Sequence, residues 1–345
     1  MTVPRPRRVR PAVFAGAAAL LFGALAVGLF SGPSALAPWS VVVEVVDRIT
    51  PFDLDSGLDT RQAAVVWDLR LPRVLLGAVV GATLAAAGAA YQGVFRNPLA
   101  DPYLLGVAAG AGLGATLAIA AGGGSALVVP VAAFAGAVLA VVATYTLGGV
   151  AGMRRTGVTL ILAGVAVAAF FTAAQTFVQQ RNADSIREVY SWILGRLGTV
   201  GWGEVAILAP YATVAVSVLL LHRRLLDVLA VGEEEAETLG ASPARIRLAV
   251  VLAATLGTAA AVAVAGLIGF VGIVVPHAVR LTAGASYRII LPISVMGGAA
   301  FLVLADTVAR TAMAPSEIPI GVVTAFVGGP FFALVLRTRA GGGRT

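Results

Sequence analysis

Residues 223–247 read RRLLDVLAVGEEEAETLGASPARIR, a polar stretch between two long apolar segments. Gly232 is followed by four carboxylates, and the positive end of a helix dipole favours negative charge there: Glu233, Glu234, Glu235 and Glu237. Gly240 predicts a left-handed residue that ends this helix, and Ser242 with Pro243 predicts the N-cap and first residue of the next helix. The stretch therefore predicts an exposed corner between two helices, either a solvated connector or a docking element for a soluble partner. Because a helix of about two turns needs something to pack against, docking is favoured.

The composition requires a lipid environment. Hydrophobic residues make up 59% of the 345 residues, charged residues make up 12%, and the mean hydropathy is +0.94, more apolar surface than a soluble domain can bury. The chain contains no cysteine and no lysine, which excludes disulfides, thiol nucleophiles and an ATP-binding P-loop of its own. With only His222 and His277, no histidine-built metal site is expected. The net charge of +7 is attributed to cytoplasmic arginines and not to nucleic-acid binding.

The apolar segments predict an all-α polytopic membrane protein with ten transmembrane helices. The predicted spans are residues 11–30, 71–91, 104–121, 127–147, 158–180, 205–221, 248–268, 273–281, 289–307 and 320–336. This topology places both termini and most of the arginines in the cytoplasm, in agreement with the positive-inside rule. Small residues predict close helix contacts in the second and third spans: Gly77, Gly81, Gly106, Gly110 and Gly114.

The chain divides into three parts. Residues 1–30 hold an arginine-rich tail and the first transmembrane helix; a cleaved signal peptide is the alternative, but the apolar run is longer than a usual signal core. Residues 31–69 form an outer linker, in which residues 39–49 are expected to lie as an amphipathic helix at the membrane interface. Residues 70–345 form the transmembrane core, which contains the polar stretch 223–247.

The fifth span has one polar face, formed by Thr172, Gln175, Thr176 and Gln179, which recur at helical spacing. Lipid does not tolerate such a face, so it meets either another helix through hydrogen bonds or a translocation path. Beyond this span, Ser185 and Glu188 match a capping box that opens a short outer helix at residues 186–194, ended by Gly195.

Six strings, in order along the chain, resemble the permease subunits of ABC importers for iron-siderophore complexes, haem and vitamin B12, the FecCD type. They lie at matching places in the predicted topology, and the resemblance covers nearly everything after Asp68. The strings are RLPR at 70–73, RNPLADPYLLG at 96–106, GEEEAETLG at 232–240, GFVGIVVPH at 269–277, LADTVAR at 304–310 and EIPIGVVT at 317–324.

The resemblance implies a type II ABC importer permease fold, with ten helices per subunit and the pathway between two subunits. The implied ATPase-coupling residues are Gly232, Glu233, Glu234, Ala236, Leu239, Gly240, Ser242 and Pro243. The implied pathway residues are Thr172, Gln175, Thr176, Gln179, Ser191, Trp192 and Gly195. Arg70, Arg73 and Arg310 match arginines that dock an extracytoplasmic binding protein; the plainer interpretation is that they are interfacial arginines with snorkelling side chains.

The resemblance also implies the partners. These are a second permease subunit (the same chain or a related one), two ATP-binding subunits that carry ATP-Mg, a substrate-binding protein and the lipid of a bacterial inner membrane. The chain itself is expected to bind no cofactor or metal and to catalyse no reaction. Ferric siderophore is preferred as substrate on family frequency, with haem or vitamin B12 as alternatives. Arg181, Arg187 and Arg196 near the outer mouth would suit an anionic chelate or be ordinary surface charges.

Two other classes of function are weighed. An ion-driven secondary transporter would need acidic ligands at mid-membrane, but the acids lie in loops, with Asp306 the chief exception. An intramembrane enzyme would need a Ser/His/Asp or paired-carboxylate cluster at one depth, which the sequence does not offer. His277 and Asp306 fall in strings that the resemblance assigns to helix packing, so both are interpreted as structural.

Overall fold

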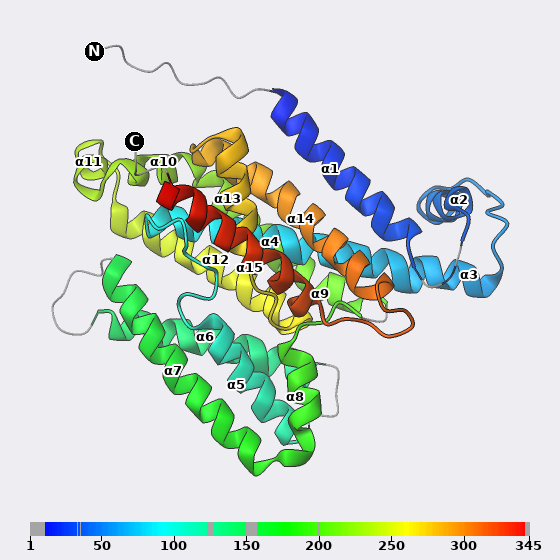
Figure 1. Cartoon of the computed structure of the whole chain (residues 1–345), viewed down its shortest axis with the longest axis horizontal. Helices are drawn as coiled ribbons and strands as arrows, with labels where there is room; N and C mark the ends of the chain where they lie inside the picture. The colour runs from blue at the N-terminus through cyan, green and yellow to red at the C-terminus, as the bar shows by residue number, and fades with distance from the viewer. Residues whose placement is uncertain are drawn as a thin grey trace.

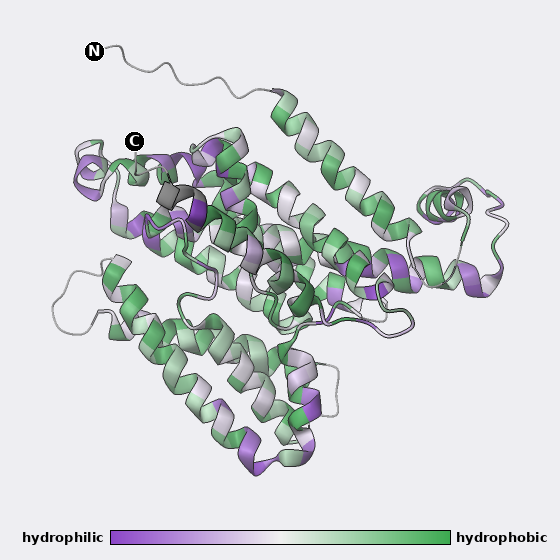
Figure 2. Ribbon diagram, in the orientation of Figure 1, coloured by the Kyte–Doolittle hydropathy of each residue, from purple (hydrophilic) through white to green (hydrophobic). Residues whose placement is uncertain are grey.

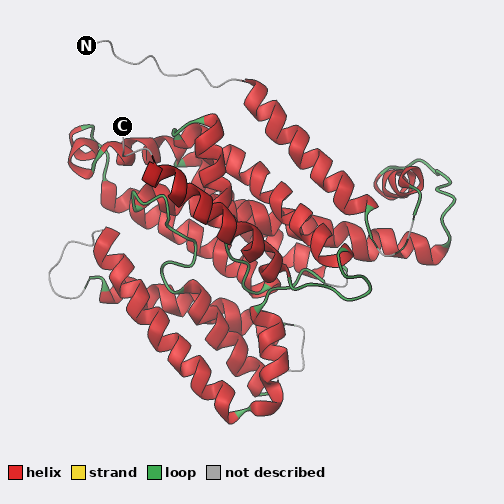
Figure 3. Cartoon of the chain, in the orientation of Figure 1, coloured by secondary structure: helices red, strands yellow, loops and turns green. Residues whose placement is uncertain are grey.

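The computed structural model describes residues 11–32, 34, 36–122, 127–149, 157–198 and 201–341. Most of these residues are helical, the others form loops and turns, and none of them lies in a strand (Figure 3). The N-terminal tail and residues 342–345 lie outside the described ranges. The helices are α1 (Pro11–Phe30), α2 (Pro38–Ile49), α3 (Thr60–Ala64), η1 (Val65–Arg70), α4 (Leu71–Val94), α5 (Val107–Ala120), α6 (Val128–Leu147), α7 (Gly157–Arg181), η2 (Ala183–Ser185), α8 (Ile186–Ile193), α9 (Gly203–Leu221), α10 (Arg223–Val231), α11 (Glu233–Thr238), α12 (Pro243–Ala265), α13 (Val271–Ala283), α14 (Tyr287–Thr311) and α15 (Ile320–Gly341).

Seven helices in the described part of the chain are long and apolar enough to cross a membrane. They are α1, the continuous helix Thr60–Val94, α6, α7, α9, α12 and α14. Three shorter apolar helices accompany them, at Val107–Ala120, Val271–Ala283 and Ile320–Val335. The all-α membrane fold is thus confirmed, whereas the number of ten crossings stays a prediction. Figure 2 shows hydrophobic residues along the long helices and hydrophilic ones gathered at α10–α11 and near α3.

Three helices form the centre of the bundle. Buried residues make up 78% of the apolar window in the helix that contains α4, 78% in α12 and 61% in α14, against 11% in α1 and 22% in α7. α4 packs against α12, α13 and α14, while α5, α6 and α7 pack together beside α12. The exposed faces of α1 and α7 are therefore left to lipid or to another chain.

Glycines allow the central helices to touch through their backbones. A Cβ at Gly81 of α4 would collide with the carbonyl of Gly298 in α14, and one at Gly88 would collide with the carbonyl of Gly272 in α13. A Cβ at Gly110 of α5 would likewise meet a backbone carbonyl of α6. These contacts confirm the close approach predicted at Gly81 and Gly110, since helices pack tightest in lipid where side chains are smallest.

Two local expectations are wrong. Gly106 was expected inside the third span, but it has a φ of 84° and precedes the first residue of α5, Val107. Only glycine adopts this conformation without strain, so Gly106 makes the turn into the helix. Ser185 was expected to cap the short outer helix, but its hydroxyl donates to the carbonyl of Asn182 at 2.9 Å and makes no cap hydrogen bond.

The elements that carry polar residues lie at opposite ends of the bundle. α10 and α11 lie at one end, where α15 also finishes, and α2 and α3 lie at the other (Figure 1). α4 runs between these ends, from its start beside η1 to its finish near α10. α2 occupies the residues predicted to form an amphipathic helix, and its place at the membrane interface stays a prediction.

The glycine contacts predict a large effect from a single methyl group. Gly88→Ala should lower the free energy of unfolding by about 1–3 kcal/mol, because an added group in a packed core forces the backbones apart. Gly23→Ala in α1 is the matched control, since a Cβ there meets nothing within 4 Å. Thermal unfolding in detergent should show a loss for Gly88→Ala only; equal midpoints for the two variants would contradict the assignment.

Candidate functional site

The polar stretch 223–247 folds into an exposed element, the acidic elbow, made of α10, α11 and the corner that leads to α12. Gly232 separates α10 from α11, which has only six residues. Gly240 has a φ of 78°, the left-handed conformation predicted for the residue that ends the helix. α12 begins at Pro243, also as predicted, but the side chain of Ser242 makes no cap hydrogen bond.

A few buried side chains fix the elbow to the bundle. Leu226 and Leu229 of α10 and Ala236 of α11 are buried. Arg247 of α12 is also buried, and its guanidinium donates to the carboxylate of Glu233. This ion pair joins α11 to α12 and explains why so short a helix holds its position.

The rest of the elbow faces outward. Leu239 is 70% exposed, and the exposed acidic residues around it are Glu234, Glu235 and Glu237. Of the other predicted coupling residues, Gly240 and Ser242 are exposed, while Gly232 and Pro243 are buried. The elbow thus presents an exposed leucine together with three exposed carboxylates, a mixture of apolar and polar groups that is found on protein-binding surfaces.

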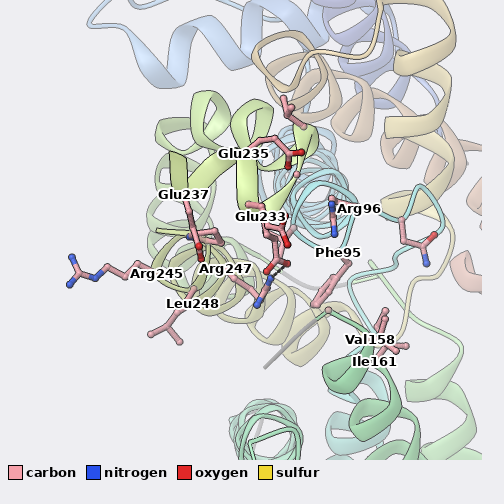
Figure 4. A pocket seen from close by; sticks show the side chains of 18 of the residues that line it. Phe95, Arg96, Val158, Ile161, Glu233, Glu235, Glu237, Arg245, Arg247 and Leu248 are labelled. Atoms are coloured by element: carbon pink, nitrogen blue, oxygen red, sulfur yellow. Dashed lines mark hydrogen bonds and ion pairs between the residues drawn. The ribbon is translucent and has the colours of Figure 1, made fainter. Parts of the chain in front are cut away.

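A cavity of about 1160 Å³ opens between the elbow, the start of α12, the end of α4 and the start of α7. Its wall is apolar at Phe95, Val158 and Ile161 and charged on the elbow side. In Figure 4, Glu233 and Arg247 point toward each other, whereas Arg245 points away from the other labelled residues. The elbow therefore stands partly clear of the membrane helices and has room to change position.

An ionic cluster, formed by Arg73, Asp306, Arg310 and Glu317, lies at the opposite end of α4. Arg73 Nη2 lies 2.8 Å from Asp306 Oδ1, and its Nη1 lies 2.8 Å from Glu317 Oε1. Arg310 Nε lies 3.4 Å from the other oxygen of Asp306. One guanidinium thus joins α4, α14 and the loop that leads to α15, a planar fork that suits two carboxylates at once.

The three arginines predicted to dock a binding protein are engaged inside the chain. Arg70 and Arg310 are each 4% exposed; Arg70 donates to the carbonyls of Leu29 and Ser34, and Arg310 donates to that of Gly28. Their docking role stays a prediction that requires these contacts to change. Sequence reasoning missed Glu317 as the partner of Arg73, and the only available signal was its place in a quoted string.

The predicted pathway residues occupy two environments. On α7, Thr172 and Thr176 are exposed and Gln175 and Gln179 are half-buried; the amide of Gln175 lies against Gly112 of α5. Ser191 of α8 is exposed. Trp192 and Gly195 are buried, where the turn after α8 meets the turn after α12. One member of the polar face thus contacts another helix, and the role of this face in a translocation path stays a prediction.

The described part of the chain holds no group of three or more His, Cys, Asp or Glu side chains placed to bind a metal ion. His277 is buried and packs edge-on against Phe331, with 5.9 Å between the ring centroids.

The apolar helices define a multi-pass membrane protein, and the elbow gives it an exposed acidic surface outside those helices. The FecCD transport family matches residues 19–338, and the chain belongs to this family. It is 44% identical over 286 residues to the cobalamin import system permease protein BtuC of Halobacterium salinarum, covering 83% of this chain and 77% of that one. It is 39% identical to the hemin transport system permease protein HmuU of Yersinia pestis, covering 79% and 84%.

A solved structure has the same fold. It is described as an inward-facing conformation of a metal-chelate type ABC transporter, and it matches with a TM-score of 0.80 and 28% identity over 95% of this chain and 99% of that one. The resemblance found from the six strings is thereby confirmed, and the chain is an ABC transporter permease.

The ionic cluster predicts that the stability of the folded chain depends strongly on Arg73. Arg73→Ala removes the main partner of a carboxylate that is 4% exposed and should cost about 3–5 kcal/mol of stability. Arg73→Ala with Asp306→Asn should recover part of this loss, because the buried charge is gone. Arg187→Ala, at an exposed arginine of α8, is the control and should change stability by about 0.5 kcal/mol or less. The measurement is the unfolding midpoint of each variant in detergent. A change for Arg73→Ala as small as that of the control would contradict the assignment of Arg73 as the main partner of Asp306.

The ion pair between Glu317 and Arg73 predicts that the stability of the folded chain depends on pH. The hydrogen bond from Arg73 lowers the pKa of the Glu317 carboxyl below its usual value. A lowered pKa means that the ionised carboxylate stabilises the folded chain above the ordinary glutamate pKa, and that this contribution is lost as pH falls through the lowered value. The difference in melting temperature between the wild type and Glu317→Gln should therefore shrink as pH falls below about 4. A difference that is constant with pH would show that the pair is not formed.

Proposed function

We propose that this chain is the membrane-spanning permease of an importer that moves a bulky metal chelate across a bacterial inner membrane. Two such subunits form the path, two separate ATP-binding subunits supply the energy, and an extracytoplasmic protein delivers the substrate. Both termini of the chain lie in the cytoplasm. The chain itself holds no ATP-Mg and performs no chemistry on the substrate.

The acidic elbow is the observation that supports this proposal most directly. It stands outside the apolar helices and exposes Leu239 among carboxylates, while Arg247 and Ala236 hold its base to the bundle. A soluble ATPase subunit that receives Leu239 in an apolar cleft with basic edges would complement this surface. Because the elbow is packed against α4, α12 and α14, a push on it reaches the centre of the fold.

Two kinds of chelate are candidates for the cargo. A ferric siderophore is the preference from the sequence. A cobalt corrinoid is the second candidate, favoured by the 44% identity to a protein named for cobalamin import. Transport of radiolabelled ferric hydroxamate, haem and cyanocobalamin by cells that express the complete importer separates them, because each cargo competes only with its own unlabelled form. A cell that accumulates none of the three would contradict both candidates.

The elbow predicts an uncoupled phenotype. Glu234→Ala with Leu239→Ala should reduce cargo moved per ATP hydrolysed by about fivefold or more, since truncating an apolar anchor at an interface costs upward of about 1 kcal/mol. Insertion of the permease should be unchanged, because both side chains point outward. Leu54→Ala, an exposed leucine of the linker, is the matched control. Unchanged uptake and unchanged assembly with the ATPase would refute the coupling role.

The energy source separates this function from an ion-driven transporter. Uptake should stop when ATP is depleted and continue when the proton and sodium gradients are collapsed. The reverse result would favour the secondary transporter.

A further inference from the structure

The first turn of α14 is capped by a side chain from another helix. Ser286 occupies the N-cap position of α14, but its hydroxyl makes no cap hydrogen bond to that helix. Instead Asp227 of α10 accepts a hydrogen bond from the Ser286 hydroxyl at 2.7 Å and another from the backbone N–H of Tyr287 at 2.5 Å. A carboxylate at this position satisfies a free N–H group of the first turn and interacts with the positive end of the helix dipole.

Packing around this contact ties it to the centre of the bundle. A Cβ built on Gly93 of α4 would lie 3.0 Å from the Tyr287 ring and 3.1 Å from Leu226 of α10, so these two side chains cover the end of α4 together. The guanidinium of Arg280, from α13, lies over the Tyr287 ring and donates to the side-chain oxygen of Gln92. The elbow, α4, α13 and α14 therefore meet within one turn of helix.

The neighbouring charge contributes less. Arg288 Nε lies 3.7 Å from Asp227, and its side chain is 58% exposed. An ion pair at this distance, with the arginine side chain exposed to solvent, contributes little to stability. The directional part of the contact is the pair of hydrogen bonds to Ser286 and Tyr287.

α14 extends this contact across the bundle. Its 25 residues span about 37 Å at the usual rise per residue, and its far end carries Asp306 and Arg310 of the ionic cluster. A displacement of α10 that Asp227 passes to α14 is thus delivered beside Arg73 and the loop before α15.

We propose that Asp227 is a positioning residue that transmits movement of the acidic elbow to α14. The inference rests on the proposed function, in which a partner ATPase moves the elbow. Asp227 touches no substrate; it acts by keeping α10 and the first turn of α14 together, so that the two move as one body. An ordinary stabilising cap would hold the helix in place without any effect on coupling, and the experiment separates these roles.

The experiment uses the complete importer in proteoliposomes and a reporter on the far side of α14. Because the chain has no cysteine, Ala312→Cys, an exposed position directly after α14, is the only thiol in the permease. Its labelling rate with a membrane-impermeant maleimide is measured with and without ATP and vanadate, and ATP hydrolysis is measured on the same sample. The variants are Asp227→Ala, Asp227→Asn and Arg288→Ala.

Asp59→Ala is the matched control. Asp59 caps α3 through a capping box within its own segment, so its removal weakens a local cap without touching the elbow. Thermal unfolding of each variant shows whether the two losses of a cap are equal in stability.

The expected result is that ATP changes the labelling rate in the reporter protein and that Asp227→Ala reduces this change about fivefold, the order expected from losing one cap. ATP hydrolysis should continue. Asp227→Asn should restore most of the change, since its amide oxygen can accept from the Tyr287 N–H while its NH2 group donates to the Ser286 hydroxyl. Arg288→Ala and Asp59→Ala should leave the change intact.

Three outcomes overturn the inference. Either the labelling rate does not respond to ATP in the reporter protein, or Asp227→Ala responds like the wild type, or Asp59→Ala loses the response to the same degree. Failure of the proposed function is distinguishable, because the complex with unaltered Asp227 would then neither assemble with an ATPase nor hydrolyse ATP.

Discussion

The backbone contacts of α4 organise the structure. Gly81 and Gly88 bring α14 and α13 so near that a single methyl group would collide with a carbonyl, and α12 covers another face of the same helix. In lipid no hydrophobic force draws helices together, so this close packing supplies the cohesion. Both ends of α4 are held in place by contacts with other helices. At one end Arg73 belongs to the ionic cluster. At the other end Gln92 accepts a hydrogen bond from Arg280, and Gly93 packs against Tyr287 and Leu226.

The two polar regions differ in how they treat charge. In the ionic cluster, Arg73 and Asp306 are nearly sheltered from solvent, and each charge is satisfied within the chain. In the acidic elbow, Glu233 is paired with Arg247 and the remaining carboxylates of α11 are exposed. The first arrangement binds helices to one another, and the second leaves a surface for another protein. α14 touches both regions, which makes it the element through which an event at one end can reach the other.

Helix positions could be predicted from the sequence because they depend on local signals. The apolar run 11–30 coincides with α1, Gly240 ends α11, and Pro243 begins α12. The spacing of Gly81 and Gly110 was enough to anticipate backbone contact, since small residues have few other uses in such helices.

Partner choice could not be predicted, because it is decided by the tertiary fold. Arg73 and Glu317 are 244 residues apart. No local feature of the sequence distinguishes an arginine that will form an ion pair from one that will face solvent. Ser185 shows the same limit in reverse, since a matching cap pattern was present and the hydroxyl found a different acceptor. The cap on α14 could not be predicted from the sequence either, because Asp227 lies 60 residues before Tyr287, whose backbone N–H donates to it.

The account depends on the elbow being at the cytoplasmic face, where ATP is available. Leu239→Cys provides the direct measurement, since Leu239 is exposed and the chain has no native cysteine. A membrane-impermeant maleimide should label this thiol in inverted membrane vesicles and leave it unlabelled in right-side-out vesicles, and a bound ATPase should protect it. Labelling from the outside, or labelling that the ATPase does not change, would contradict the account.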